Sequence, residues 1–447
     1  MSTLKVNKLR DTTGSTDAIV LDPSGGAVLA GVTTVSTVKV GSGVTISSDG
    51  DVFTTGITTS STVIVGSGVT ISESGIEASG IGITVANING GQIGGRRNLV
   101  INGDMRVAQR GTSSTSSNGF YMIDRYWQYN QDTDEAPTFS QSDVSSGTPA
   151  YQAGFRKALK ITNGNQTSGA GVSDQIQLEY RFEAQDIANS GWNYTSSTSF
   201  LTLSFYIKSS VAQAFNLFLK TEDGTEKNMP LSTPSLTADT WTRVIFSIKG
   251  DSGISFNDDE GKGLSINLSP FTGTNYTSNS ITNGEWIAWS SATRYRDITS
   301  TWYTTNDATL EITGLQLEVG PEATAYEHRS FGEELALCQR YFYRSADGGS
   351  NTLGLGINYT SSYMMAAIFF PVTMRSIPTL SSASGSNYYE FIRNGGADWF
   401  NSFTLGNRTT NKIGELYNNS EISGTVGHGG FVRTDNSAVF VDFVAEL

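Results

Sequence analysis

The N-terminal part of the chain is a repeat whose units cannot form a core by themselves. VKVGSGVTIS at Val38–Ser47 recurs as VIVGSGVTIS at Val63–Ser72, 25 residues later (Val38 to Val63). The segments Val28–Thr34 and Phe53–Thr59 align at the same spacing, and a degenerate third copy runs from Gly75 to Thr84. Because Val, Ile and Thr alternate with polar residues and Gly interrupts the runs, each copy is predicted to form two or three short strands.

Such a unit presents one narrow apolar face, which is buried only if units stack on one another or on other chains. About three copies with Phe53 as their only aromatic residue would make a weak solenoid as a monomer. Three chains wound together would cover these faces and leave no free sheet edges. We therefore predict that residues 1–95 form a homotrimeric β stalk. A flexible Gly- and Ser-rich tail is the alternative, which the close recurrence disfavours.

Charge and cysteine content exclude other classes of protein. A formal net charge of −13 argues against a nucleic-acid partner, whose binding needs basic surfaces. The single cysteine, Cys338, excludes disulfides within the chain. No basic segment precedes an apolar run after Met1, so we expect no signal peptide. The longest apolar run, Met364–Val372, is far shorter than the roughly 20 residues of a membrane span, so we expect no membrane insertion.

From Asn98 to about Glu327 the chain changes to aromatic-rich segments that alternate apolar with polar residues. Clusters of turn residues separate these segments, and no regular alternation of helix and strand is present. Many short strands with such punctuation are typical of an antiparallel β-sandwich. The predicted strands are Leu201–Lys208, Phe215–Lys220, Trp241–Lys249, Gly263–Leu268 and Thr309–Glu318.

A helix is predicted directly after the sandwich. The strand ending near Gly320-Pro321 is followed by Ser330 and, three residues later, Glu333, which is the spacing of a capping box. Leu335, Cys338 and Phe342 recur at i, i+3 and i+7, as on one face of a helix of about three turns. We expect this stripe to meet its copies around a threefold axis or to pack on a C-terminal sheet.

Further alternating segments predict a smaller β domain after the helix. The predicted strands are Leu353–Ile357, Tyr363–Val372, Glu390–Arg393, Ser402–Leu405 and Ala438–Val444. The fold class is therefore mainly β: a repetitive trimeric stalk, a jelly-roll sandwich, a short linking helix and a small C-terminal β domain. The predicted boundaries are 1–95, 96–329 and 330–447.

Five segments share a pattern with a known family: NLVINGDM (Asn98–Met105), Asp124-Arg125-Tyr126-Trp127, Trp241–Asp251, Asn257–Leu264 and Ile312–Phe342. They resemble a jelly-roll module of tailed-bacteriophage fibre proteins, which is akin to carbohydrate-binding modules of the galactose-binding-like superfamily. Pro371–Leu380 and Ala445-Glu446-Leu447 resemble the small C-terminal domain that often follows this module. The N-terminal repeat is similar to stalks of cyanophage structural proteins.

The resemblance implies a virion protein, made in the host cytoplasm, that acts in host adsorption. Its trimeric stalk would attach through the N-terminus to other tail or baseplate proteins. The C-terminal domain would be the tip, and the ligand would be a host cell-surface polysaccharide. Two alternatives stay open: a polysaccharide-cleaving tailspike, and an architectural fibre adaptor that binds no receptor. Related jelly rolls also hold a structural calcium near their first and last strands, which would place it at Asp104 and Glu318. No other cofactor is expected.

The residues themselves contain no pattern typical of an enzyme. Only two histidines exist, His328 and His428, and neither has the convergent partners of a zinc site or a catalytic triad. The adjacent carboxylates Asp258, Asp259 and Glu260 lie in a Gly-bounded turn, where neighbouring side chains point apart. A pair of glycosidase carboxylates must flank one bond. We expect no catalytic activity.

Glycan binding needs aromatic faces beside a few polar groups. Two groups of residues have this composition. For each single tryptophan a place in the sandwich core is the alternative, and for the C-terminal group a place in the core of its own domain is equally open. The first group is Trp286, Trp289 and Trp302, and the second, in the C-terminal domain, is Tyr388, Tyr389, Arg393, Asp398 and Trp399.

Overall fold

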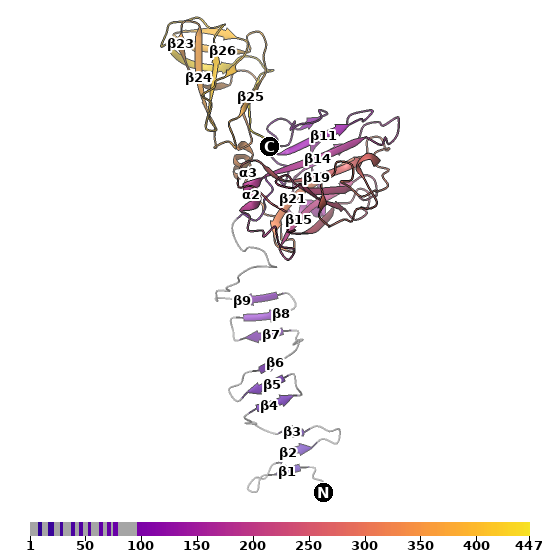
Figure 1. Ribbon diagram of the computed structural model, residues 1–447. Helices are drawn as coiled ribbons and strands as arrows, with labels where there is room; N and C mark the ends of the chain where they lie inside the picture. Colours follow the sequence, from indigo (N-terminus) through magenta and orange to yellow (C-terminus); the bar gives the residue numbers. More distant parts are fainter. Residues whose placement is uncertain are drawn as a thin grey trace. The chain divides into compact units, whose positions relative to one another are not determined.

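The computed structural model describes residues 96–447 and, before them, the backbone of a series of short strands (Figure 1). Contacts divide the chain into two compact units, Met1–Thr84 and Val85–Leu447. The first boundary between units therefore lies at Thr84/Val85, eleven residues before the predicted boundary at 95/96 (95 − 84). No helix within the described residues is long and apolar enough to cross a membrane.

The described strands of the first unit form three-stranded antiparallel sheets. The two copies of the ten-residue block each fold as a hairpin: β4 pairs with β5, and β7 pairs with β8. A third strand completes each sheet, so the predicted strands of the two close copies are confirmed. Of the degenerate third copy, β9 (Gly75–Ala78) is described, and the residues after Ala78 up to Thr84 lie outside the described ones. The strands are β1 (Lys8–Arg10), β2 (Asp17–Leu21), β3 (Ala27–Leu29), β4 (Thr37–Val40), β5 (Val44–Ser47), β6 (Val52–Thr54), β7 (Thr62–Val65), β8 (Val69–Ser72) and β9 (Gly75–Ala78).

The second unit begins with the predicted β-sandwich, built from two six-stranded antiparallel sheets. The first sheet has the order β10-β12-β13-β21-β15-β18 and the second has the order β11-β14-β19-β16-β17-β20. In Figure 1 the strands β11, β14 and β19 lie side by side in the second layer. The first sheet contains β10 (Ser113–Ser114), β12 (Thr138–Asp143), β13 (Lys157–Thr162), β21 (Thr309–Val319), β15 (Phe200–Ser209) and β18 (Thr242–Lys249). The second contains β11 (Tyr126–Gln131), β14 (Gln175–Glu183), β19 (Lys262–Thr272), β16 (Asn216–Thr221), β17 (Lys227–Ser232) and β20 (Ile287–Ala288).

Alternation along these strands places one side of each sheet in a common core. On β14, Ile176, Leu178, Tyr180 and Phe182 are buried in the core. The residues between them therefore point out of the sandwich, because successive side chains of a strand lie on opposite faces. Two short helices, α1 (Pro149–Gln152) and α2 (Ala184–Ala188), complete the module.

The segment Asn98–Met105 is tied to the last strand of the sandwich by buried hydrogen bonds. Asn98 Nδ2 donates to the Leu315 carbonyl at 3.2 Å, and Leu317 N donates to Asn98 Oδ1 at 3.1 Å. Gly103 approaches the same strand so closely that a Cβ would lie 2.1 Å from the Leu315 carbonyl oxygen. This motif therefore closes the sandwich, and its polar residues are structural.

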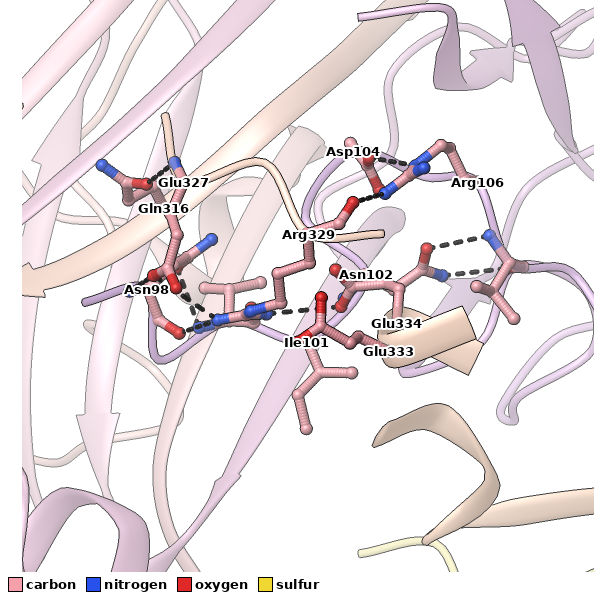
Figure 2. Close-up of polar contacts among 12 residues, drawn as sticks. Asn98, Ile101, Asn102, Asp104, Arg106, Gln316, Glu327, Arg329, Glu333 and Glu334 are labelled. Atoms are coloured by element: carbon pink, nitrogen blue, oxygen red, sulfur yellow. Dashed lines mark hydrogen bonds and ion pairs between the residues drawn. The ribbon is translucent and has the colours of Figure 1, made fainter. Parts of the chain in front are cut away.

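The predicted capping box is present at the start of α3 (Phe331–Gln339), where Glu333 N donates to Ser330 Oγ and Ser330 N donates to Glu333 Oε2. The helix is tied to the sandwich: Asn102 N donates to Glu334 Oε1 at 2.5 Å (Figure 2). Cys338 is buried as predicted, but the helix ends at Gln339. Placing Phe342 on the helix was wrong, since Phe342 begins a strand.

The remaining residues form the small C-terminal β domain, with its own core between a three-stranded and a seven-stranded antiparallel sheet. The first has the order β22-β31-β25 and the second β27-β26-β30-β23-β24-β29-β28. The strands are β22 (Phe342–Asp347), β23 (Thr352–Thr360), β24 (Tyr363–Phe369), β25 (Thr379–Ser382), β26 (Tyr389–Arg393), β27 (Gly396–Phe400), β28 (Thr404–Leu405), β29 (Ile413–Asn418), β30 (Gly429–Thr434) and β31 (Phe440–Val444).

Candidate functional site

A groove of about 370 Å³ lies on the outer face of the second sheet of the sandwich. Strand pairing brings its residues together: Tyr129 on β11 lies opposite Gln177 on β14, and Trp127 lies opposite Glu179. Two further residues come from the segment that follows β19. The groove is lined by Asn118, Trp127, Tyr129, Gln131, Gln175, Gln177, Glu179, Arg181, Tyr276 and Arg294.

Aromatic rings in the groove are half-buried and held by cations. The Arg181 guanidinium lies 3.9 Å from the centroid of the Trp127 ring, and that of Arg294 lies 4.5 Å from the centroid of Tyr276. Burial, together with the neighbouring Tyr276, raises the pKa of Tyr129. The Tyr129 hydroxyl therefore stays protonated at neutral pH, and it donates to Gln131 Oε1 at 2.5 Å.

A line of ion pairs crosses the same face. Glu179 contacts Arg181 at 2.8 Å and Lys262 at 2.7 Å, and Lys262 continues to Glu222 at 2.8 Å. Burial acts to raise the pKa of Glu179, but its hydrogen bonds and ion pairs with Arg181 and Lys262 outweigh burial and lower it. Glu179 is therefore a carboxylate at neutral pH, able to accept hydrogen bonds and unable to act as an acid.

Polar atoms at the floor of the groove have incomplete hydrogen bonding. Gln177 Nε2 donates to Gln175 Oε1 at 2.7 Å, and Arg294 Nη2 donates to the same oxygen. Within the part of the chain that the structure describes, the buried Nε atoms of Arg181 and Arg294 have no hydrogen-bond partner. A buried donor without a partner is costly, but both Nε atoms have almost no accessible surface, so they are not donors that a ligand reaches in this structure.

A second hollow of about 480 Å³ lies beside the ends of β14 and β19. Its lining is mainly Gly, Ser, Thr and Asn, and its one aromatic side chain, Phe271, is stacked on Tyr303 at 3.9 Å. Because that ring is already occupied, this hollow offers no aromatic platform to a sugar. The groove is the better candidate for a binding site.

The three tryptophans predicted from the sandwich sequence have different surroundings. Trp302 is 0% exposed in the core, so no ligand reaches its ring. Trp286 is half-buried against the core and donates to the Lys249 carbonyl at 2.7 Å. Trp289 lies on the outer face of the second sheet, where Lys220 Nζ is 4.5 Å from its ring centroid. Of the three, Trp289 shares the face that carries the groove.

The predicted C-terminal group is split between core and surface by the hairpin β26–β27. Tyr389 is 0% exposed in the second core, and Tyr388 packs on that core. Arg393 Nη2 donates to Asp398 Oδ2 at 2.5 Å, so these two groups satisfy each other. Trp399 is 48% exposed and donates to Asp435 Oδ2 at 2.9 Å. Of the aromatic residues in this group, Tyr389 is buried, Tyr388 is half-buried and Trp399 is exposed.

The two carboxylates of the calcium hypothesis have separate partners. Asp104 is paired with Arg106, although burial raises its pKa (Figure 2). Glu318 accepts from Thr324 N at 2.8 Å and from Thr324 Oγ1 at 2.6 Å. Among the residues that the structure describes, no group of three or more His, Cys, Asp and Glu side chains is placed to hold a metal ion. Calcium binding stays a prediction.

The groove residues were missed in the sequence, although a signal is present. β14 reads QIQLEYRFE, with every second residue polar, and β11 reads YWQYNQ, with Trp127 and Tyr129 at alternate positions. Aromatic, amide and charged groups at the solvent-facing positions of these strands are the residue types that a glycan site uses. That the two strands are neighbours is decided only by the fold.

No protein-family model and no curated protein sequence matches the chain. Among solved structures, similarity is found to the enzymatically active domain of tailspike protein 4 of bacteriophage CBA120, at 9% identity and a TM-score of 0.26, over 50% of this chain and 21% of that one. A family 11 carbohydrate-binding module from Clostridium thermocellum, in complex with a β-1,3-1,4-mixed-linked tetrasaccharide, matches at 13% identity and a TM-score of 0.22, over 48% and 97%. The tandem CBM22 domains of Paenibacillus barcinonensis Xyn10C match at 9% identity and a TM-score of 0.25, over 81% and 100%. These neighbours are carbohydrate-binding modules and a phage tailspike domain, and the case for a ligand rests on the groove's own residues.

Proposed function

We propose that the β-sandwich is a glycan-binding module and that the groove on β11 and β14 is its site. The observation that carries the proposal is the set of aromatic, amide and charged side chains on adjacent strands of one sheet face. Sugars are bound by stacking of C–H groups on aromatic rings, with orientation set by a few hydrogen bonds. Tyr129 and Tyr276 supply the rings, and Gln177, Glu179 and Arg181 supply donors and acceptors.

The same groups favour binding over cleavage. A glycosidase needs one carboxylic acid with a raised pKa to protonate the leaving group. The pKa of Glu179, the carboxylate that lines the groove, is lowered by its cationic neighbours, so that proton is not available there. The proposed function is therefore recognition without hydrolysis.

At the level of the whole chain, we propose a phage fibre protein that recognises host-surface glycan. The repeat of the first unit would hold three chains together, attach them to other tail proteins and so place three modules on one virion component. Three weak sites that engage a repeated glycan gain effective concentration, and overall avidity can exceed a single affinity by roughly 10²–10⁴. Sedimentation equilibrium of the full-length protein tests the trimer, and a monomer contradicts it.

The binding site is tested by screening the full-length protein against a glycan array and titrating the polysaccharides that bind. Tyr129→Ala is expected to weaken binding about tenfold, or about 1.4 kcal/mol, with intact folding. Tyr121→Ala, an exposed aromatic residue of the sandwich outside the groove, is the matched control and is expected to leave affinity unchanged. Trp399→Ala tests the predicted alternative site and is expected to leave the affinity of a single groove unchanged. The opposite result would move the site to the hairpin β26–β27, and an array without binding would overturn the proposal.

Two measurements separate the remaining functions. Release of reducing ends from a bound polysaccharide would show a cleaving tailspike and contradict recognition without hydrolysis. Preincubation of host cells with the pure protein is expected to block phage adsorption. An architectural adaptor would give no protection.

A further inference from the structure

The seven-stranded sheet of the C-terminal domain has two apolar faces, of which one is exposed. The inner face packs on the three-stranded sheet through residues such as Met364, Phe391 and Val432. An antiparallel sheet with one solvated face normally alternates apolar-in with polar-out. Here the outward positions are apolar as well, which is typical of a sheet covered on both sides.

Strand pairing places the exposed residues on one continuous surface, called here the apolar face. Leu355 on β23 lies opposite Phe431 on β30 and Ala367 on β24, and Phe369 lies opposite Ile413. The apolar face consists of Leu355 (66% exposed), Ile357 (45%), Tyr359 (64%), Phe369 (71%), Trp399 (48%), Ile413 (36%) and Phe431 (55%).

The charges of this face are few and largely balanced. Glu390 and Arg433 lie opposite each other on β26 and β30, and Arg433 Nε donates to Glu390 Oε1 at 2.6 Å. One row of paired residues crosses the middle of the face without a charge: Ile392, Phe431, Leu355 and Ala367. The next residue in this row is Glu415 on β29, which is charged. With Glu390 and Arg433 paired, Glu415 leaves the face a single net negative charge, which is too little to match a strongly charged partner.

We propose that the apolar face is covered by other copies of the same chain. The exposed area of its side chains is on the order of 600 Å², if a whole aromatic side chain has roughly 150–250 Å². This area approaches the roughly 800 Å² that each partner contributes to a standard interface. A chain with a net charge of −13 repels its copies. A contact between copies therefore requires an uncharged face.

This proposal deepens the trimer in the proposed function by naming a contact outside the repeat, and it does not depend on glycan binding. It predicts that the pure full-length protein is oligomeric and that the apolar face is hidden in the oligomer. Hydroxyl-radical footprinting measures this directly. Tyr359, Phe369 and Phe431 are expected to react at least fivefold more slowly than Tyr121, which is 38% exposed on the sandwich.

The variant that tests the proposal carries two charged substitutions on the apolar face. Leu355→Asp combined with Phe431→Asp is expected to remove the protection of Tyr359 and Phe369. The matched control, Val172→Asp with Ile245→Asp, changes two equally exposed residues of the sandwich (58% and 50%) and is expected to preserve it. If circular dichroism shows that the double aspartate variant does not fold, Leu355→Gln is the milder variant. It too is expected to reduce the protection of Tyr359 and Phe369.

The outcomes are distinct. An oligomer in which the apolar face reacts as fast as Tyr121 overturns this proposal while leaving a trimer held by the repeat intact. A monomer by sedimentation overturns both. The intrinsic affinity of a single groove for glycan is read separately, whereas a monomer would lose the avidity that three linked sites give.

Discussion

The Arg181 guanidinium lies 3.9 Å from the centroid of the Trp127 ring while its Nη2 contacts Glu179 at 2.8 Å. One cation is thus fixed by three partners: an aromatic face on β11, a carboxylate on its own strand, and the Leu447 carbonyl, to which its Nη1 donates. An arginine held in this way loses little further freedom when it donates to a ligand. The guanidinium is therefore a preorganised group in the lining of the groove.

Arg181→Met keeps much of the side-chain volume and removes the donors. Glycan affinity is expected to fall about tenfold, or about 1.4 kcal/mol, measured by calorimetry. Arg181→Lys is expected to restore little of the lost glycan affinity, because an ammonium lacks the planar fork that stacks on Trp127. Arg156 also stacks on an aromatic ring, 3.7 Å from the centroid of Tyr151, but lies outside the groove. Arg156→Met is the control, and an equal loss there would refute a specific role for Arg181.

Glu446 is expected to stabilise the second unit through a buried ion pair. Arg125 Nη1 contacts Glu446 Oε2 at 2.5 Å, and the two side chains are 1% and 5% exposed. Glu446→Gln leaves the arginine charge buried without its partner, which costs about 3–5 kcal/mol. Urea unfolding measures the loss. Asp143→Asn, which breaks an ion pair between exposed groups of Lys157 and Asp143, is expected to cost less than about 1 kcal/mol.

Asp124 is expected to make stability fall as pH rises through the weakly acidic range. Burial raises the pKa of Asp124 to about 6, although Arg110 acts to lower it. Between the two pKa values Asp124 therefore stays protonated in the folded protein, whereas in the unfolded chain it releases its proton near the ordinary pKa of an aspartate. The stabilisation that this proton gives the folded state is complete below about pH 4 and is lost as pH rises to about 6. It amounts to roughly 3 kcal/mol of unfolding free energy.

Asp124→Asn cannot titrate, so the difference in unfolding free energy between wild type and variant should change between pH 4 and 6 and be flat above pH 7. Denaturant titrations at a series of pH values measure it. A difference that is constant across this range would show that Asp124 keeps an ordinary pKa in the folded protein.

The capping box at the start of α3 gives a smaller effect. Ser330→Ala removes the acceptor for Glu333 N and is expected to cost about 1 kcal/mol. Ser330→Asp, which can also accept this bond, is the control and is expected to recover most of that loss. Thermal unfolding followed by circular dichroism compares the three proteins, and equal melting temperatures would mean that the cap does not contribute.

Strand positions were predictable because alternation is a local property. Trp241–Lys249 and Thr309–Glu318 were predicted as strands and agree with β18 and β21 to within one residue. Phe342 was misplaced because the i, i+3, i+7 spacing of Leu335, Cys338 and Phe342 continues past the true helix end at Gln339. A short periodic run says nothing about where the chain leaves the helix.

Site residues were harder to predict, because an aromatic side chain in a sandwich sequence packs inside as readily as it faces a ligand. Trp302 and Tyr389 have suitable neighbours in the sequence, yet both are buried in cores. Trp127 and Tyr129 alternate on a short strand that was not predicted, and their partners are about fifty residues further along the chain on β14.

The sequence by itself determined the mainly β fold, the repeat, the start of the linking helix and the absence of disulfides within the chain. Each depends on residues that are close together in the sequence or on composition. The tertiary structure decided which strands are neighbours, and with it the groove on β11 and β14 and the apolar face of the C-terminal sheet. Both surfaces are formed by strands that are distant in the sequence and pair in the fold. The pairing register of such strands depends on many side chains together, so no local sequence pattern predicts it.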